Sequence, residues 1–297
     1  MSPRKEALLG VALVVLYTGA ISCADAITKH IASGYTAPQL FAISGLAVAG
    51  LCMLVTRPAG TVPRTRLWRP TLARCALGIV ASVAFFLSFR LLPMAEVFLF
   101  IGLMPIMSAT LSGPMLGERL QPGTWFALAL GALGVFFLFP DGLHNIGAGH
   151  AVALCAAITG SLSLVLARYI SNRERASLAQ VFYPNLAMGA VMALALPFVW
   201  RPMGTAELLL VAAYSVALFA ARWLCVLALR LLPVHVVTLL MSLQFVWMVW
   251  LGGRFFGEVP GMHVYIGAAV VTAAGAVLVL QRMMPQPGAE PVSKSPT

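Results

Sequence analysis

Charged residues are scarce in this sequence. They make up 9% of its 297 residues, and hydrophobic residues make up 61%, whereas a typical soluble domain has about 25% and about 45–50%. A soluble protein of this length could not cover its surface with so few charges. A soluble globular fold is therefore excluded, and lipid is the expected solvent for most of the chain.

Acidic residues are the scarcer of the two signs. The chain has 9 Asp and Glu against 19 Lys and Arg, which gives a net charge of +10. A basic balance can indicate nucleic-acid binding. Here the basic residues lie between apolar runs, which is how a membrane protein carries its orientation, so no nucleic-acid partner is expected.

The residue spacings that hold cofactors or metals are absent. The chain has no G-x-x-x-x-G-K-[ST] loop and no H-E-x-x-H motif, and Gly147-Ala148-Gly149 lacks the third glycine of a dinucleotide fingerprint. The 5 cysteines form no C-x-x-C pair and lie in or beside apolar runs, as small apolar residues do. The sequence therefore predicts no cofactor, no metal site and no catalytic residues.

Apolar runs long enough to cross a membrane dominate what is present. A helix needs about 20 apolar residues to span the hydrocarbon core. The first run is longer than a signal-peptide core and lacks a convincing cleavage site, so it is interpreted as a retained span. The tail 284–297 is predicted to be a disordered cytoplasmic segment. Ten runs qualify, roughly 7–31, 36–56, 71–92, 94–115, 123–140, 147–170, 178–200, 206–229, 234–256 and 261–283.

Basic residues are distributed unevenly between the two sides of these spans. With the N-terminus inside, 14 Lys and Arg fall on the cytoplasmic side and 4 on the other side. This bias follows the positive-inside rule. An even number of spans then places both termini in the cytoplasm.

One stretch of the chain is repeated 140 residues later without a gap. Residues 87–118 align with 227–258, and 12 of the 32 columns are identical, including Arg-Leu-Leu-Pro at the start and Gly-Glu at the end. The repeats are assigned to 7–140 and 147–283. Because each contains five spans, an odd number, the second enters the membrane from the opposite side. The predicted fold is an all-α integral membrane protein of ten helices in two inverted five-helix repeats, an arrangement typical of secondary transporters that work by alternating access.

These motifs resemble the drug/metabolite transporter (DMT) superfamily, specifically its ten-helix EamA-type members. The likeness rests on Arg-Leu-Leu-Pro-x-x-x-Val before the fourth and ninth helices, on Gly-Glu after them, and on Phe255-Phe256-Gly257-Glu258-Val259-Pro260 with Gly267 and Ala274-Gly275. The overall pattern is similar to YddG-type exporters of aromatic and other neutral amino acids. The resemblance implies a carrier in the bacterial inner membrane and a central cavity formed by helices one, three, four, six, eight and nine.

Polar residues inside the first span form a stripe. Thr18, Ser22, Asp25 and Lys29 fall on one face of a regular helix, and ionisable residues within a bilayer usually face a cavity. Two interpretations stay open. Asp25 either pairs with Lys29 at i,i+4 near the outer surface, or it meets a substrate ammonium or a proton.

The eighth span carries Tyr214, Ser215 and Arg222 on one side, with Trp223 nearly beside them. Arg222 either snorkels toward the cytoplasm or forks a substrate carboxylate. In the fourth span, Glu96 is explained by the dipole of the first helical turn or by a substrate ammonium.

In the ninth span, His235 shares a face with Thr238 and Ser242, and Gln244 points the other way on a regular helix. His235 is either a solvated or hydrogen-bonded residue or a pH-sensing one. Several aromatic residues either line an apolar cavity or pack elsewhere. The candidate substrate-binding residues are Tyr17, Ser22, Asp25, Phe86, Glu96, Phe100, Tyr214, Arg222, Trp223, His235, Gln244 and Trp247.

The expected function is secondary transport of a small organic metabolite, in the first place an aromatic or neutral amino acid, out of the cytoplasm. Membrane lipid and the substrate are the expected partners, and a proton is the candidate coupling ion. Carriage of a vitamin, a nucleotide-like compound or a drug-like compound is the alternative within transport. An integral membrane enzyme and a helical scaffold or channel are the alternatives of other classes.

Overall fold

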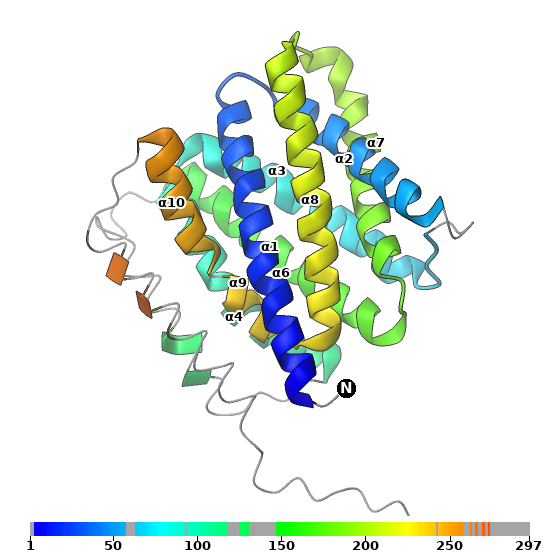
Figure 1. Ribbon diagram of the computed structural model, residues 1–297, viewed down its shortest axis with the longest axis vertical. Coiled ribbons are helices and arrows are strands. Elements are labelled where there is room, and N and C mark those ends of the chain that lie inside the picture. Colours follow the sequence, from blue (N-terminus) through cyan, green and yellow to red (C-terminus); the bar gives the residue numbers. More distant parts are fainter. Residues whose placement is uncertain are drawn as a thin grey trace, which may run out of the picture.

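The computed structural model describes residues 3–57, 63–92, 94–117, 147–241 and 243–257, with a few further residues between 125 and 133 and between 262 and 273. Within these ranges the regular structure is helical, with no strand (Figure 1). Six of the described helices are long and apolar enough to cross a membrane by length and composition. The prediction of an all-α, multi-pass membrane fold is confirmed. Most of the predicted helices 123–140 and 261–283, and the tail 284–297, lie outside the described residues.

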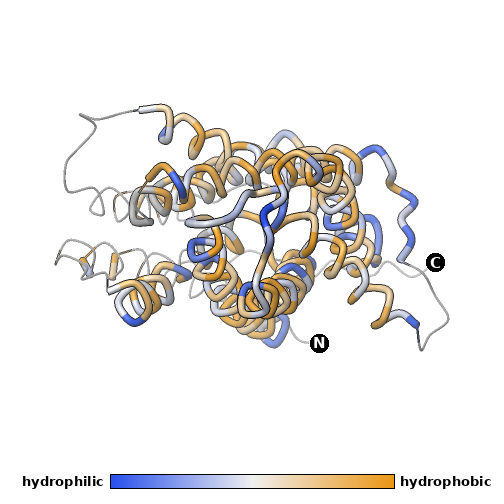
Figure 2. The backbone as a smooth tube through the Cα atoms, turned by 90° about the horizontal axis from the view of Figure 1, so that it is seen from above, coloured by the Kyte–Doolittle hydropathy of each residue, from blue (hydrophilic) through white to orange (hydrophobic). Residues whose placement is uncertain are grey.

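The helices lie side by side in one bundle (Figure 1). Their apolar residues continue along their lengths, and hydrophilic residues gather mostly at helix ends and connecting segments (Figure 2). Large apolar side chains also cover the outside, where Phe198 is 87% exposed, as expected of a surface that faces lipid. The helices are α1 Pro3–Ala32, α2 Ala37–Thr56, α3 Trp68–Leu91, α4 Met94–Leu116, α6 Ala148–Arg173, α7 Ser177–Val199, α8 Thr205–Leu231, α9 Val234–Met241 and α10 Gln244–Phe256.

The Arg-Leu-Leu-Pro motif ends α3 and α8 in the same way. Leu92 and Leu232 follow the last helical residues with extended backbones, at φ −126°, ψ 152° and φ −121°, ψ 147°. A residue before proline is pushed out of the helical region by the proline ring, so the motif stops each helix and turns the chain toward the next one.

The Gly-Glu motif has an equally local role. Gly117 ends α4 and Gly257 ends α10, with φ of 68° and 65°. Only glycine adopts this left-handed conformation without a steric cost, and it is a common way to close a helix. Each of these two glycines therefore closes its helix.

Helix boundaries recur at the 140-residue offset both outside the aligned stretch and inside it. α2 begins at Ala37 and α7 at Ser177, and α3 ends at Leu91 and α8 at Leu231. The contacts between helices follow the same pattern: α1 and α6 are counterparts, as are α8 and α3, and each packs on a helix of the other half. α1 packs along α8 as α6 packs along α3, and α2 packs on α7 between these pairs. Such exchange is what two like units give when they are related by a two-fold axis through the α2–α7 contact.

The predicted ninth helix, 234–256, is wrong as a continuous element. α9 ends at Met241 and α10 begins at Gln244. Between them, the amide of Leu243 donates to Leu240 O and the amide of Val246 donates to Leu243 O, each at 3.0 Å. These i to i−3 bonds tighten one turn. Hydrophobic periodicity does not reveal such a local change, because the run stays apolar on both sides of it.

α7 shows how a polar backbone group is satisfied inside the bundle. Pro184 lies within α7 and has no N–H to donate to the carbonyl of Gln180, four residues earlier. Arg74 of α3 donates to that carbonyl instead, at 2.7 Å, and to Gln180 Oε1 at 3.0 Å. In hydrocarbon an unsatisfied carbonyl would cost several kcal/mol, so this buried arginine has a structural role.

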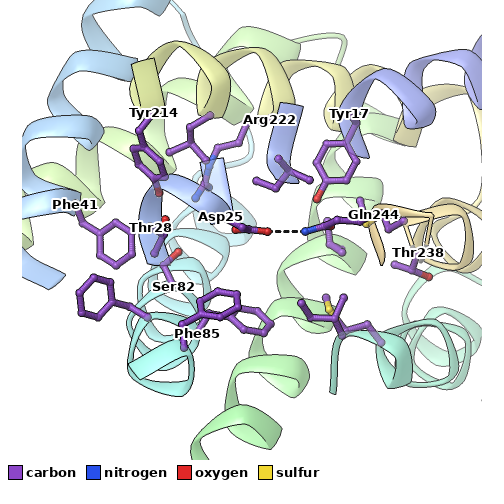
Figure 3. A pocket seen from close by; sticks show the side chains of 18 residues that line it. Tyr17, Asp25, Thr28, Phe41, Ser82, Phe85, Tyr214, Arg222, Thr238 and Gln244 are labelled. Atoms are coloured by element: carbon purple, nitrogen blue, oxygen red, sulfur yellow. Dashed lines mark hydrogen bonds between the residues drawn. The ribbon is translucent and has the colours of Figure 1, made fainter. Parts of the chain in front are cut away.

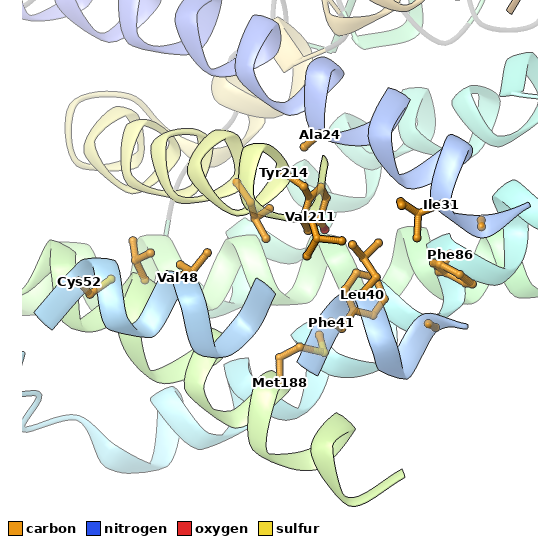
Figure 4. Packing of buried hydrophobic residues seen from close by; sticks show 14 of the residues in the cluster. Ala24, Ile31, Leu40, Phe41, Val48, Cys52, Phe86, Met188, Val211 and Tyr214 are labelled. Atoms are coloured by element: carbon orange, nitrogen blue, oxygen red, sulfur yellow. The ribbon is translucent and has the colours of Figure 1, made fainter. Parts of the chain in front are cut away.

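The α2–α7 contact depends on glycine. A Cβ added at Gly45 would lie 2.7 Å from both Asn185 O and Gly189 N, and one added at Gly189 would lie 2.8 Å from Leu46 N. Small residues allow such a backbone approach between helices in a membrane. Around this contact, apolar side chains of α1, α2, α3, α7 and α8 form the largest core cluster, part of which is drawn in Figure 4.

We expect Gly45→Ala to destabilise the protein, because its methyl group would push α2 away from α7. Overpacking of this kind costs about 1–3 kcal/mol, against about 1 kcal/mol gained from helix propensity. Gly50→Ala, on the same helix, is the matched control, since a Cβ there meets nothing within 4 Å. Thermal unfolding in detergent should show a lower midpoint for Gly45→Ala only. Equal midpoints for the two variants would contradict the close contact.

Candidate functional site

A cavity of about 190 Å³ lies inside the bundle, lined by residues of α1, α2, α3, α4, α6, α8, α9 and α10 (Figure 3). It is smaller than the roughly 300–1,000 Å³ of typical ligand pockets, so in this conformation it suits a small molecule. Its lining is mostly apolar. The polar side chains that line it are Tyr17, Asp25, Thr28, Ser82, Tyr214, Arg222, Thr238 and Gln244.

The acidic side of the cavity is held by α1 and α10. Gln244 Nε2 donates to Asp25 Oδ2 at 2.5 Å (Figure 3). One turn earlier on α1, Ser22 Oγ donates to the carbonyl of Gln244 at 3.4 Å. Two bonds therefore fix the start of α10 against the polar stripe of α1. Lys29, further along that stripe, lies 4.7 Å from the ring centroid of Phe256 at the end of α10.

The basic group of the cavity is Arg222 of α8. Its Nε is buried and has no hydrogen-bond partner among the described residues. Arg74 is the contrasting case, because its guanidinium donates twice to Gln180. A buried charged donor that makes no hydrogen bond lowers the stability of the folded protein. Arg222 thus lines the cavity with one buried donor that has no partner among the described residues.

Aromatic rings form another part of the wall. Phe41, Phe85, Phe86 and Phe89 line the cavity, and the rings of Phe41 and Phe86 meet edge to face, with centroids 5.8 Å apart. Edge-to-face pairs hold rings in a defined geometry. The cavity therefore combines an apolar aromatic region with one carboxylate and one guanidinium.

Six of the candidate residues meet in this cavity: Tyr17, Asp25, Phe86, Tyr214, Arg222 and Gln244. Glu96 lies in the first turn of α4 and His235 in α9, and their side chains are outside the described residues. The remaining four candidates lie elsewhere.

Ser22 is buried behind Asp25. Phe100 is buried in a separate cluster, with its ring centroid 6.2 Å from that of His150. Trp223 packs on Phe219, with ring centroids 5.5 Å apart. Trp247 is 41% exposed, on the side of α10 that passes Gly19. On a helix that is apolar all round, the sequence does not show which face an aromatic residue occupies. Sequence reasoning therefore could not distinguish these residues from the aromatic residues that line the cavity.

The predicted direction of the Gln244 side chain is wrong. A regular helix from 234 to 256 would point it away from Thr238, yet both side chains line the cavity. The tightened turn at Leu243 lies between them, so α10 does not continue α9 in the assumed register.

Some cavity residues were missed, and the repeat could have found several of them. Ser82 is the counterpart of Arg222 at the 140-residue offset, and both line the cavity. The same holds for Met104 with Gln244, and for Ile101 with Met241. Thr28 follows Asp25 by three residues on α1, which is one turn along the same face.

Comparison with known proteins agrees with a membrane transporter fold. Residues 5–139 match the EamA-like transporter family. No curated protein matches the chain. The fold is similar to a crystal structure of a protein with 21% sequence identity and a TM-score of 0.73, covering 93% of this chain and 99% of that chain. At this identity the likeness concerns the fold alone.

We expect Gln244→Leu to destabilise the protein by about 1–3 kcal/mol, because it removes the donor to a carboxylate within the bundle. Trp247→Phe, three residues later on an exposed face, is the matched control and should stay within about 0.5 kcal/mol of the unchanged protein. Thermal unfolding in detergent compares the two. A Gln244→Leu midpoint as high as that of Trp247→Phe would show that the bond to Asp25 does not matter for stability.

Proposed function

We propose that the chain is a secondary transporter of a small amino acid-like metabolite, because residues 5–139 match the EamA-like transporter family. The family consists of membrane transporters of small molecules. We further propose that the protein works in the bacterial inner membrane and exports its substrate, with an aromatic or neutral amino acid as the first candidate.

The observation that carries the substrate proposal is the pair of opposite charges in one small cavity. Asp25 and Arg222 both line it, and no hydrogen bond or ion pair joins them in the described part of the chain. A free amino acid carries one charge of each sign. Arg222 would bind the carboxylate, for which the planar guanidinium offers two parallel donors, and Asp25 would bind the ammonium.

The surrounding lining supports the same proposal. The Gln244 amide fixes the Asp25 carboxylate, and a positioned group loses less entropy when it binds. The four phenylalanines offer an apolar surface to a substrate side chain. A phosphorylated substrate would require several cations, whereas Arg222 is the one basic residue among the described residues that line this cavity.

We propose alternating access between two inverted repeats as the mechanism. The matching helix boundaries and the exchanged packing partners on either side of the α2–α7 contact support it. Inverted repeats can exchange conformations, which moves the opening from one side of the membrane to the other. The interrupted α9–α10 segment beside the cavity is also typical of transporters, because irregular backbone is tolerated where it lines a cavity.

Arg222→Ala should reduce uptake of the substrate into proteoliposomes by about tenfold or more, the equivalent of one charge-assisted hydrogen bond of about 1.5–3 kcal/mol. Arg254→Ala is the control, since Arg254 is exposed on α10 with its guanidinium 5.8 Å from the Phe255 ring centroid. Both variants should insert and unfold like the unchanged protein. Equal uptake by the two variants would remove Arg222 from the substrate site.

The substrate class is tested with a panel of radiolabelled amino acids and vitamins in the same vesicles, at two pH values. We expect saturable uptake of at least one neutral or aromatic amino acid. A dependence on the pH difference would identify a proton as the coupling ion. Saturable uptake of vitamins alone would contradict the amino acid proposal while leaving transport intact.

A further inference from the structure

A second hollow, which we call the α2–α8 groove, lies between the C-terminal half of α2 and the N-terminal half of α8. Its volume is about 770 Å³. It is separate from the substrate cavity, because the consecutive residues Tyr214 and Ser215 of α8 line one each. The groove opens to the outside of the bundle, where Leu54 and Val216 on its rim are 58% and 59% exposed.

The described residues that line the groove offer no free hydroxyl to an occupant and are otherwise apolar, apart from Arg57 at one end. Ser215 and Thr56 line it, but their hydroxyls already donate to carbonyls of their own helices, Ser215 to Val211 O at 2.7 Å and Thr56 to Cys52 O at 3.1 Å. A Cβ added at Gly50 would meet nothing within 4 Å, so the groove has free space beside this residue. The groove therefore offers a surface for hydrocarbon rather than for a polar solute.

Arg57 is the exception at one end of the groove. It follows the last residue of α2 as its C-cap and lines the groove. Its side chain is exposed and makes no hydrogen bond or ion pair with the described residues. The helix dipole accounts for a cation at this helix end, but the guanidinium also lines an apolar groove, and the combination fits a molecule with an apolar chain and an anionic head.

The length of α2 places this arginine relative to a bilayer. Twenty helical residues rise about 30 Å, which is the thickness of the hydrocarbon core. Arg57 therefore lies where acyl chains give way to headgroups, with the groove extending from it into the hydrocarbon. Phosphate at that depth carries a negative charge that a guanidinium can pair with.

We propose that the α2–α8 groove binds one phospholipid with an anionic headgroup. An acyl chain lies between α2 and α8, and the net negative charge of the headgroup pairs with Arg57. In a zwitterionic headgroup such as phosphatidylcholine, the choline cation offsets the phosphate charge and weakens this pairing. This site is independent of the substrate cavity, so it holds whether or not the transported molecule is an amino acid.

The test is native mass spectrometry of the purified full chain, titrated with phosphatidylglycerol and with phosphatidylcholine of the same acyl chains. We expect the first phosphatidylglycerol to bind at least fivefold more tightly than phosphatidylcholine. Arg57→Gln should reduce phosphatidylglycerol affinity at least fivefold, to the level of phosphatidylcholine. Gly50→Leu should reduce the affinity for both lipids at least fivefold, because the new side chain fills the groove.

Two controls match these changes. Arg64→Gln removes an exposed arginine from the segment that joins α2 to α3, and Ala190→Leu adds apolar volume on an exposed face of α7. Both should bind lipid like the unchanged protein. Val216→Phe narrows the groove from the α8 side and replaces Gly50→Leu if that variant unfolds.

Equal affinity of the unchanged protein for the two lipids would overturn the proposal. So would an Arg57→Gln variant that binds like Arg64→Gln, or groove-filling variants that bind like Ala190→Leu.

Discussion

A polar group inside the hydrocarbon has to find its partner within the bundle, and the structure of this chain is organised by that constraint. The carbonyl that Pro184 frees is bonded by Arg74. The hydroxyls of Thr18, Thr28 and Ser44 donate to carbonyls of their own helices. Six buried side-chain atoms of the described residues lack a partner, on Ser108, Ser161, Ser177, Arg222 and Arg230, and of these five residues only Arg222 lines the central cavity.

Two similar halves build one cavity with unlike sides. Ser82 and Arg222 occupy corresponding positions, as do Met104 and Gln244, and all four line the same space. The shared features are backbone features: the helix ends at Leu91 and Leu231, and the left-handed glycines 117 and 257. The differing features are side chains. The two halves therefore share a backbone frame, and the charged side chains that line the cavity are not repeated between them.

Much of the fold follows from the sequence because its signals are local. Apolar runs set the spans, proline ends α3 and α8, and glycine ends α4 and α10. The candidate site was harder to predict from the sequence than the fold. Asp25 and Arg222 stand out because charge in a span is rare, and both lie in the cavity. Phe86 and Phe100 look alike in sequence, yet only Phe86 lines the cavity, because the difference depends on how helices rotate against one another. The turn at Leu243 leaves no mark in hydrophobicity, and it decides where Gln244 points.

Competition by modified substrates tests most directly whether Arg222 and Asp25 each bind one end of a zwitterion. For the amino acid that the protein carries, the free compound, its carboxamide and its N-acetyl form are compared as inhibitors of uptake by the unchanged protein and by Arg222→Ala. The unchanged protein should prefer the free amino acid to both derivatives. The variant should no longer distinguish it from the carboxamide, yet should still reject the N-acetyl form. A variant that keeps its full preference over the carboxamide would contradict the account.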